Sequence, residues 1–115
     1  IKPLKLNRKT AQLRSKLRIK SLFEQGKVRR GKFINVFYLK SSEAKVLFAV
    51  SKKVKLKPER NRIKRRLREI YRLHQDEFSA KQYYFGFVAR RSALKAPFTE
   101  LTDDFFAIMS EIGSE

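Results

Sequence analysis

The sequence predicts an α+β fold, an α-β-β-α-β-α sandwich in which helices pack over a small mixed sheet. Apolar residues recur at helical spacing in two long segments, residues 58–75 and 98–112. Runs rich in aromatic and β-branched residues, which are typical of strands, occupy residues 33–39, 46–51 and 82–89. The 115 residues contain no internal repeat and suit one domain, spanning residues 1–115, with one modest core.

The first part of the chain is predicted to hold a basic arm and a short helix. Residues 1–12 are polar and basic without a sustained apolar period, which indicates an extended, flexible arm. Leu13 and Leu17, four residues apart, begin an apolar face that predicts a helix over residues 13–25. The basic segment 27–32 contains four cations and a glycine, and we interpret it as a loop.

The next two strands are predicted to pair as a hairpin across a short polar turn. In residues 33–39 the alternation places Phe33 and Phe37 on one face. Residues 46–51 form a nearly continuous apolar run, which predicts a strand covered on both faces.

The end of the chain is predicted to hold a strand, a loop over residues 92–97 and a helix. Gly86 lies in the middle of the strand 82–89 and marks either a bulge or a close backbone approach. The last helix has the cleanest apolar period in the chain, formed by Phe98, Leu101, Phe105, Ile108, Met109 and Ile112.

The segment 52–72 is the most basic part of the chain, with eleven Lys or Arg among twenty-one residues. Steps of four, three and four residues predict a helix, ending near Gln75, that docks by one apolar stripe. The stripe consists of Ile63, Leu67, Ile70 and His74, with Tyr71 at its edge. The opposite stripe consists of Asn61, Arg65, Arg68 and Arg72. Because guanidinium groups match phosphate oxygens as two-pronged donors, the arginines favour ordered phosphate contacts over mere solubility.

The overall charge indicates a polyanionic partner. The formal net charge is +18 and the pI is near 10.7, a field that attracts polyanions and opposes self-association. An anionic membrane surface is the alternative polyanion, but no apolar run approaches the roughly 20 residues that span a bilayer. Residues 96–115 carry five acidic and no basic side chains, so the last helix is expected to face away from the polyanion. The absence of cysteine excludes disulfides and thiolate metal sites.

Catalytic or metal-ligating residues are not expected in this chain. The single histidine, His74, lies on an apolar stripe and is expected to pack there. Asp76 with Glu77, and Asp103 with Asp104, are adjacent pairs that point in different directions on a helix. A two-metal nuclease site requires several convergent carboxylates, and the sequence does not supply them.

Three segments together resemble the signature of the protein subunit of bacterial ribonuclease P. They are Ser51–Val54, Arg60–Arg65 with its Arg-Asn-Arg core, and the pair Arg68–Glu69. The resemblance extends more weakly over about Leu13 to Ile112. It implies the fold class named after domain 2 of ribosomal protein S5. It also implies a left-handed strand–helix–strand crossover at the basic helix, where general rules predict a right-handed one.

The resemblance implies an RNA-binding protein cofactor within an endoribonuclease, the ribonucleoprotein that removes the 5′ leader from precursor transfer RNA by phosphodiester hydrolysis. The catalytic groups would belong to the RNA subunit, with Mg²⁺ bound mainly by that RNA and the substrate. The implied partners are the catalytic RNA, one protein per RNA, and precursor transfer RNA in the bacterial cytoplasm, with no membrane.

Two sets of residues are candidates for binding RNA. Near the catalytic RNA we expect Lys52, Lys53, Arg60, Asn61, Arg62, Lys64, Arg65, Arg66 and Arg68. Arg60 lies close to the apolar stripe, so a capping or packing role is its alternative. On an aromatic and basic face, where bases stack on rings, we expect the leader to contact Ile19, Phe23, Phe33, Phe37, Arg90 and Arg91. For each Phe the alternative is a place in the core.

Other functions remain open at this point. A ribosomal or other structural RNA-binding protein would share the charge and the size, but it is not expected to share the Arg-Asn-Arg constellation. A DNA-binding regulator would place the basic helix in a major groove, but it normally dimerises, which the charge disfavours. A stand-alone nuclease would cleave RNA without an RNA partner.

Overall fold

The structure, a computed structural model, describes residues 11–79 and 82–113 of the chain. It contains three α-helices, a short 3₁₀ helix and five strands within these residues. The strands are β1 (Ala11–Gln12), β2 (Lys27–Arg30), β3 (Ile34–Lys40), β4 (Lys45–Val50) and β5 (Tyr83–Ala89). The helices are α1 (Lys16–Gln25), α2 (Lys57–Ser79), η1 (Arg91–Leu94) and α3 (Phe98–Gly113). No helix in the described ranges is both long and apolar enough to cross a membrane.

The five strands form one mixed sheet in the order β1-β4-β5-β3-β2. The central pair, β4 and β5, is parallel and is connected through α2. Strand β3 runs antiparallel to both β5 and β2, and β1 adds a short parallel edge to β4. The predicted α+β class and the strand–helix–strand crossover at the basic helix are therefore confirmed.

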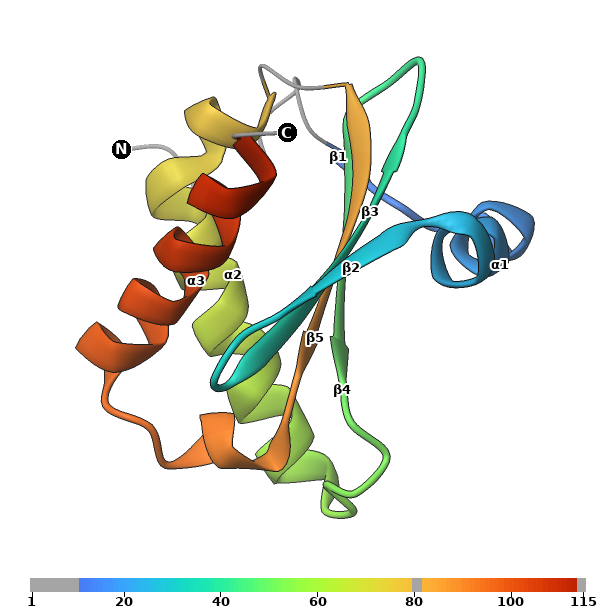
Figure 1. Cartoon of the computed structure of the whole chain (residues 1–115). Coiled ribbons are helices and arrows are strands. Elements are labelled where there is room, and N and C mark those ends of the chain that lie inside the picture. Colours follow the sequence, from blue (N-terminus) through green and yellow to red (C-terminus); the bar gives the residue numbers. More distant parts are fainter. Residues whose placement is uncertain (1–10, 80–81, 114–115) are drawn as a thin grey trace, which may run out of the picture.

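The helices cover the two faces of the sheet unequally (Figure 1). Helices α2 and α3 pack on one face and bury the main core, which contains residues such as Val36, Phe87 and Phe105. Helix α1 lies alone on the other face. Beneath it is a small core of Leu13, Leu22 and Tyr84, with Ile19, Phe37, Leu39 and Leu47 packed against it.

Both long helices follow their predicted apolar stripes. Ile63, Leu67, Ile70 and Tyr71 of α2 are fully buried, as are Leu101 and Phe105 of α3. The backbone of α2 kinks at His74, where φ is −128° and ψ is 18°, close to the predicted end of the helix. The His74 ring packs edge-on against Phe106 with their centroids 4.4 Å apart, which confirms the predicted packing role.

The predicted hairpin of the strands at residues 33–39 and 46–51 is wrong. Strand β5 lies between β3 and β4, and the hairpin is instead formed by β2 and β3. Residues 27–30, which were interpreted as a loop, are the edge strand β2. Charged side chains on an edge strand keep it from pairing with other molecules. Because β2 is such a strand, its basic composition resembles that of a loop.

The start of the chain also differs from the prediction. Helix α1 begins at Lys16, because the Ser15 hydroxyl caps it by accepting the Arg18 N–H at 3.4 Å. Leu13 precedes the helix and is buried, whereas Leu17 is 79% exposed and is not part of an apolar face. Residues 11–12, which were assigned to the flexible arm, pair with β4, and residues 1–10 of that arm lie outside the described residues.

Candidate nucleic-acid interface

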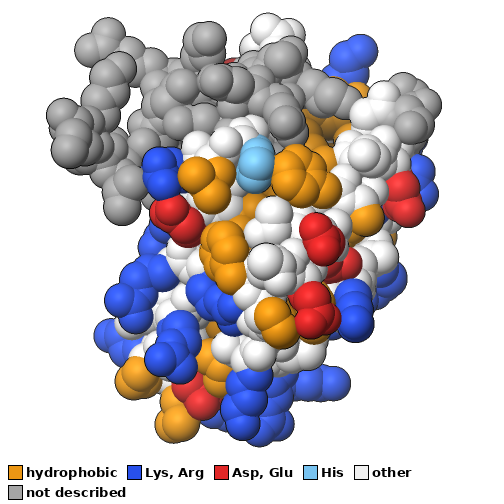
Figure 2. Space-filling view, turned by 90° about the vertical axis from the view of Figure 1, so that its left-hand side faces the viewer, with side chains coloured by type: hydrophobic (Ala, Val, Ile, Leu, Met, Phe, Trp, Pro, Cys, Tyr) orange, Lys and Arg blue, Asp and Glu red, His pale blue; other side chains and the backbone are white. Residues whose placement is uncertain are grey.

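Basic and acidic side chains separate on the face formed by α2 and α3 (Figure 2). Lys and Arg side chains predominate along one side and at the lower end of this view, whereas on the other side they are mixed with most of the Asp and Glu side chains. Helix α3 carries no Lys or Arg, as predicted from the composition of the last twenty residues. This separation creates one strongly positive side suited to a polyanion.

A shallow pocket lies on the outer face of α2, where the predicted basic stripe was placed. It is lined by Lys57, Pro58, Asn61, Arg65 and Arg68. Three of these, Asn61, Arg65 and Arg68, recur at steps of four and three residues, so the helix holds their polar ends on one line. The Arg68 guanidinium also lies over the Phe48 ring of β4, 5.9 Å from its centroid, which orients the group by a cation–π contact.

Arg60, by contrast, is engaged within the protein. Its Nη1 donates to the carbonyl oxygens of Ser51 and Val54, both at 2.9 Å, and its Nη2 donates to the Val50 carbonyl at 3.2 Å. Arg60 therefore has the alternative role given in the sequence analysis, in which its side chain caps backbone groups of the protein. Because these carbonyls bracket Lys52 and Lys53, Arg60 holds the loop that presents those two exposed lysines.

Arg66 has a similar internal role that the sequence did not reveal. Its Nη1 donates to the carbonyls of Ala93 at 2.8 Å and Leu94 at 3.0 Å, and its Nη2 donates to that of Ala96. The guanidinium therefore binds the C-terminal end of η1 and ties it to α2. Arg66 is turned away from the pocket on α2, whereas its neighbours Arg62 and Lys64 reach solvent, Arg62 fully and Lys64 in part.

The far end of the basic stripe is neutralised by an ion pair. Arg72 donates from Nη2 to Glu69 Oε1 at 2.6 Å and from Nε to Oε2 at 3.1 Å. The hydrogen bond from the Arg72 side chain lowers the pKa of Glu69 below its usual value, and the same contact raises the pKa of Arg72. The freely presented part of the stripe therefore ends at Arg68.

The second candidate surface lies on the sheet face that carries α1. The Phe23 and Phe37 rings meet edge to face, with centroids 4.7 Å apart and planes at 71°. Phe23 is 37% exposed, and Phe37 and Ile19 are half-buried. An edge of this aromatic pair is therefore accessible beside α1, as a base-stacking surface requires.

Gly86 lets α1 approach the sheet at this surface. A Cβ atom at Gly86 would lie 3.0 Å from Leu22 Cδ2 and 3.6 Å from Phe23 Cζ. The pairing of β5 with both neighbours runs through Gly86 without interruption, so the close approach, and not a bulge, accounts for this glycine.

The sheet beyond α1 adds two residues that the sequence analysis missed. Val88 pairs with Asn35 of β3 and with Ala49 of β4, one step further along the face that carries Phe37. Val88 and Ala49 are partly exposed and extend the apolar surface past the aromatic pair. Only the strand register identifies them, because their sequence neighbours are equally apolar.

Phe33 does not belong to this surface. It is 8% exposed and packs in the main core on the opposite side of the sheet, with Lys32 Nζ 5.3 Å from its ring centroid. The prediction that Phe33 shares a face with Phe37 is wrong because β3 begins at Ile34. Phe33 belongs to the preceding turn, where the strand alternation does not apply.

Arg90 is also directed into the protein. Its Nη1 donates to the carbonyls of Gly31 at 2.6 Å and Lys32 at 3.2 Å, and its Nη2 donates to Asn35 Oδ1 at 2.7 Å. Arg90 thus holds the turn between β2 and β3, whereas the adjacent Arg91 is exposed.

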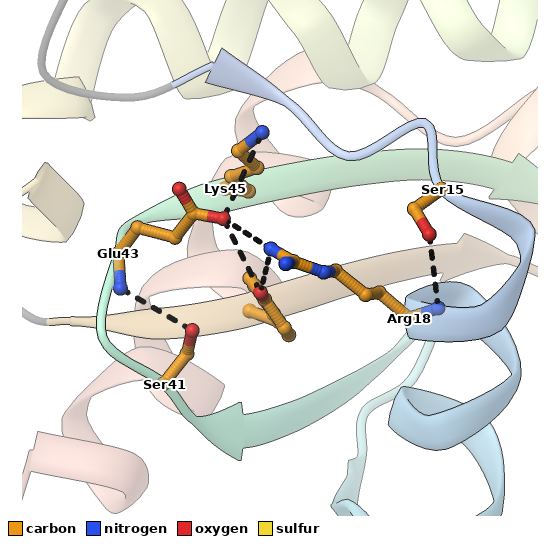
Figure 3. Close-up of polar contacts among 6 residues, drawn as sticks. Ser15, Arg18, Ser41, Glu43 and Lys45 are labelled. Carbon is orange, nitrogen blue, oxygen red and sulfur yellow. Dashed lines mark hydrogen bonds and ion pairs between the residues drawn. The ribbon is translucent and has the colours of Figure 1, made fainter.

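A polar network fixes the start of α1 on the sheet (Figure 3). Arg18 Nη1 donates to Glu43 Oε1 at 2.6 Å and to the Tyr84 hydroxyl at 2.9 Å. Lys45 Nζ lies 3.8 Å from the same Glu43 oxygen. These contacts join α1 to the connection between β3 and β4, and so set where the Phe23 end of the helix stands over the sheet.

The described carboxylates do not gather into a metal site, and Asp104 has a structural role. Among the side chains described, those of residues 12–74 and 82–113, no three His, Asp or Glu form a group that could hold a metal ion. Asp104, one of the adjacent pair considered above, accepts backbone N–H groups from Lys32, Phe33 and Ile34.

Comparisons with known proteins agree with the resemblance seen in the sequence. The family described as Ribonuclease P matches residues 7–113. The ribonuclease P protein component of Syntrophomonas wolfei is 33% identical over 107 residues, which cover 91% of this chain and 89% of that protein. The component of Thermus scotoductus is 41% identical over 90 residues, covering 77% of this chain but only 52% of the relative.

Solved structures of similar proteins share the fold. The RNase P protein of Staphylococcus aureus superposes with a TM-score of 0.76 at 17% identity, covering 88% of this chain and 94% of that one. The RNase P protein of Thermotoga maritima gives a TM-score of 0.73 at 20% identity, covering 84% and 92%.

Proposed function

The chain belongs to the ribonuclease P protein family, and we propose that it is the RNA-binding protein component of a bacterial ribonuclease P. In this role it binds the catalytic RNA and the single-stranded 5′ leader of precursor transfer RNA. The holoenzyme then removes the leader by hydrolysing one phosphodiester bond. The observation that carries the proposal is that two surfaces suited to RNA lie on opposite faces of one sheet. One is the basic row on α2, and the other is the exposed aromatic pair beside α1.

The outer face of α2 is proposed to bind the catalytic RNA. Asn61, Arg65 and Arg68 line one pocket there, and Lys52 and Lys53 are exposed at the end of β4. Folded RNA is recognised mainly through its phosphates and shape, which a rigid row of guanidinium groups suits. Arg60 and Arg66 support this surface by holding the loop and η1 beside it, without contacting RNA themselves.

The sheet face beside α1 is proposed to bind the leader. The exposed edge of the Phe23–Phe37 pair offers a stacking surface for unpaired bases, and Val88 extends it along the sheet. A paired RNA helix keeps its bases stacked inside, so this surface selects single-stranded RNA.

The hydrolysis itself is assigned to the RNA subunit, with Mg²⁺ held mainly by that RNA and by the substrate. The chain contributes charge: +18 offsets the repulsion between two RNA molecules that must approach closely. We further propose one protein per RNA and a cytoplasmic location, in line with the family resemblance.

The proposal is tested by cleavage of a 5′-extended precursor transfer RNA at low Mg²⁺ concentration. The protein alone, a bacterial ribonuclease P RNA alone and the two together are compared. Cleavage that is restored only by the mixture supports the cofactor role. Cleavage by the protein alone would show a protein nuclease, and no rescue of a cognate RNA would favour a structural RNA-binding protein.

A further inference from the structure

We propose that Lys32 and Arg91 form a second phosphate contact for the catalytic RNA, and that Asp104 and Arg90 position it. For Arg91 this replaces the contact with the leader that the sequence predicted. The inference rests on the proposed function and extends it to the turn between β2 and β3 and the adjoining η1. We call the exposed side chains of Lys32 and Arg91 the turn–η1 surface.

The turn is held on one side by a single carboxylate. Asp104 of α3 accepts the N–H groups of Lys32 at 2.7 Å, Phe33 at 2.9 Å and Ile34 at 3.1 Å. A Cβ atom at Gly31 would lie 2.6 Å from Asp104 Oδ1, so only glycine leaves room for this carboxylate. Three charge-assisted hydrogen bonds to consecutive amides leave the turn with one conformation.

The other side of the turn is held by a guanidinium group. Arg90 binds the carbonyls of Gly31 and Lys32, and the Arg90 backbone N–H donates to the Phe33 carbonyl at 2.8 Å. The backbone at residue 90 therefore lies against the turn, which brings Arg91 of η1 next to it. A turn between two strands does not need a charged side chain bonded to each side of it. The fixed conformation of this turn therefore points to a function for the side chains that it exposes.

The side chains that the turn and η1 present are accessible to a partner. Lys32 has 73% of its side chain exposed, and its acidic neighbour Glu100 is 3.7 Å away and half-exposed. Such a surface ion pair is worth little and gives way to a phosphate. Arg91 is exposed at the start of η1.

The turn–η1 surface is connected to α2 through η1. Arg66 of α2 binds the carbonyls of η1, so the row on α2, η1 and the turn form one framework. Basic side chains also gather at the lower end of the molecule in Figure 2. Lys32 contacts Phe33 and Glu100 on the side of the sheet that carries α2 and α3, away from the proposed leader surface. The shared side favours the catalytic RNA as the partner.

Arg30 provides a matched control. It is an exposed cation on the same hairpin, but it pairs with Asn35 in the register of β2 and β3, so it lies on the face that carries Phe37. Its removal changes the net charge without touching the turn–η1 surface.

The test compares the Lys32→Ala/Arg91→Ala double variant with the full protein in binding to a cognate ribonuclease P RNA at several salt concentrations. We expect about a tenfold loss of affinity, and a log–log salt slope smaller in magnitude by about 2, because two phosphate contacts are lost. Arg30→Ala should leave the salt slope for that RNA unchanged. Unchanged affinity and slope in the double variant would overturn the inference.

Two further arms separate the outcomes. If Arg65→Ala weakens binding and the double variant does not, the inference fails while the proposed function stands. If the double variant instead lowers only the holoenzyme's preference for leader-bearing over leaderless precursor transfer RNA, the phosphates belong to the leader and the assignment is wrong.

The positioning role of Asp104 is tested with Asp104→Asn. This variant should speed hydrogen exchange at the amides of Lys32, Phe33 and Ile34 and weaken RNA binding. Added to the Lys32→Ala/Arg91→Ala variant, it should cost no further affinity, because the side chains it positions are already gone. A full additional loss would show that Asp104 acts only on the stability of the domain.

Discussion

Arg18 of α1 and Glu43 of the β3–β4 connection form an ion pair with Nη1 and Oε1 2.6 Å apart, and the Tyr84 hydroxyl bonds to both (Figure 3). Beside the small core beneath α1, this polar contact is a second attachment of the helix to the sheet. The position of α1 in turn decides how much of the Phe23 and Phe37 rings is exposed to solvent.

Glu43→Gln is therefore expected to weaken leader binding several-fold. The amide keeps an acceptor for Arg18 but loses the charge, so α1 is held less firmly, while global stability changes by less than about 1 kcal/mol. The measurement is the holoenzyme's affinity for precursor transfer RNA with and without its leader. Glu24→Gln removes the same charge from the exposed surface of α1, and an equal effect in that variant would rule out the positioning role.

Phe23→Ala is expected to lower leader affinity by about 1–3 kcal/mol, the usual worth of one stacked base. Binding of the catalytic RNA should not change, because α2 lies on the other face of the sheet. Leu17→Ala, at an exposed apolar position on the same helix, is the control. Equal losses for both RNAs would mean that the substitution damages the fold.

Arg65→Ala and Arg66→Ala should have different effects, the first on RNA binding and the second on the stability of the fold. Arg65→Ala is expected to reduce the salt slope of RNA binding by about 1, with stability within about 0.5 kcal/mol of the wild type. Arg66→Ala leaves three carbonyls without their charged donor and should cost about 2 kcal/mol of unfolding free energy. Urea unfolding and RNA titration of both variants check this, and equal stabilities would contradict the internal role of Arg66.

Gly86→Ala is expected to destabilise the domain by about 1 kcal/mol and to loosen α1. The new Cβ would lie 3.0 Å from Leu22 Cδ2, and Leu22 is fully buried, so the helix must shift to make room. Thermal unfolding together with hydrogen exchange in α1 measures both effects. A gain in stability would indicate that Leu22 relaxes without moving the helix.

The Glu69–Arg72 contact predicts a small dependence of stability on pH. The hydrogen bond lowers the pKa of Glu69 in the folded state, so its stabilisation is present above the usual glutamate pKa and disappears as pH falls through the lowered value. The stability difference between wild type and Glu69→Gln should therefore shrink in acid. A difference that stays constant down to pH 2 would contradict this linkage.

Several features followed from local sequence alone. The apolar period of 98–112 specifies α3, and the stripe of Ile63, Leu67 and Ile70 specifies the docking face of α2. By exclusion the same stripe specifies the outward row of Asn61, Arg65, Arg68 and Arg72, although only the structure shows that Arg72 is paired with Glu69. These predictions succeed because helical periodicity is a property of neighbouring residues and needs no knowledge of the partner surface.

Other features depended on contacts between distant segments. Strand β2 exists because it pairs with β3, and β5 enters between β3 and β4 although it follows them by more than thirty residues. Arg65 and Arg66 are adjacent and identical in kind, yet one faces the pocket and the other binds the carbonyls of η1.

The sequence by itself determined the charge, the class of partner, the helical faces and the family signature of this protein. Only the tertiary structure decided which basic and aromatic side chains are available to RNA. A guanidinium group can bind a carbonyl or a phosphate, and a Phe can pack in a core or against a base. The choice depends on what the rest of the chain places within hydrogen-bonding or van der Waals distance, as Asp104 and Arg90 show at the turn between β2 and β3.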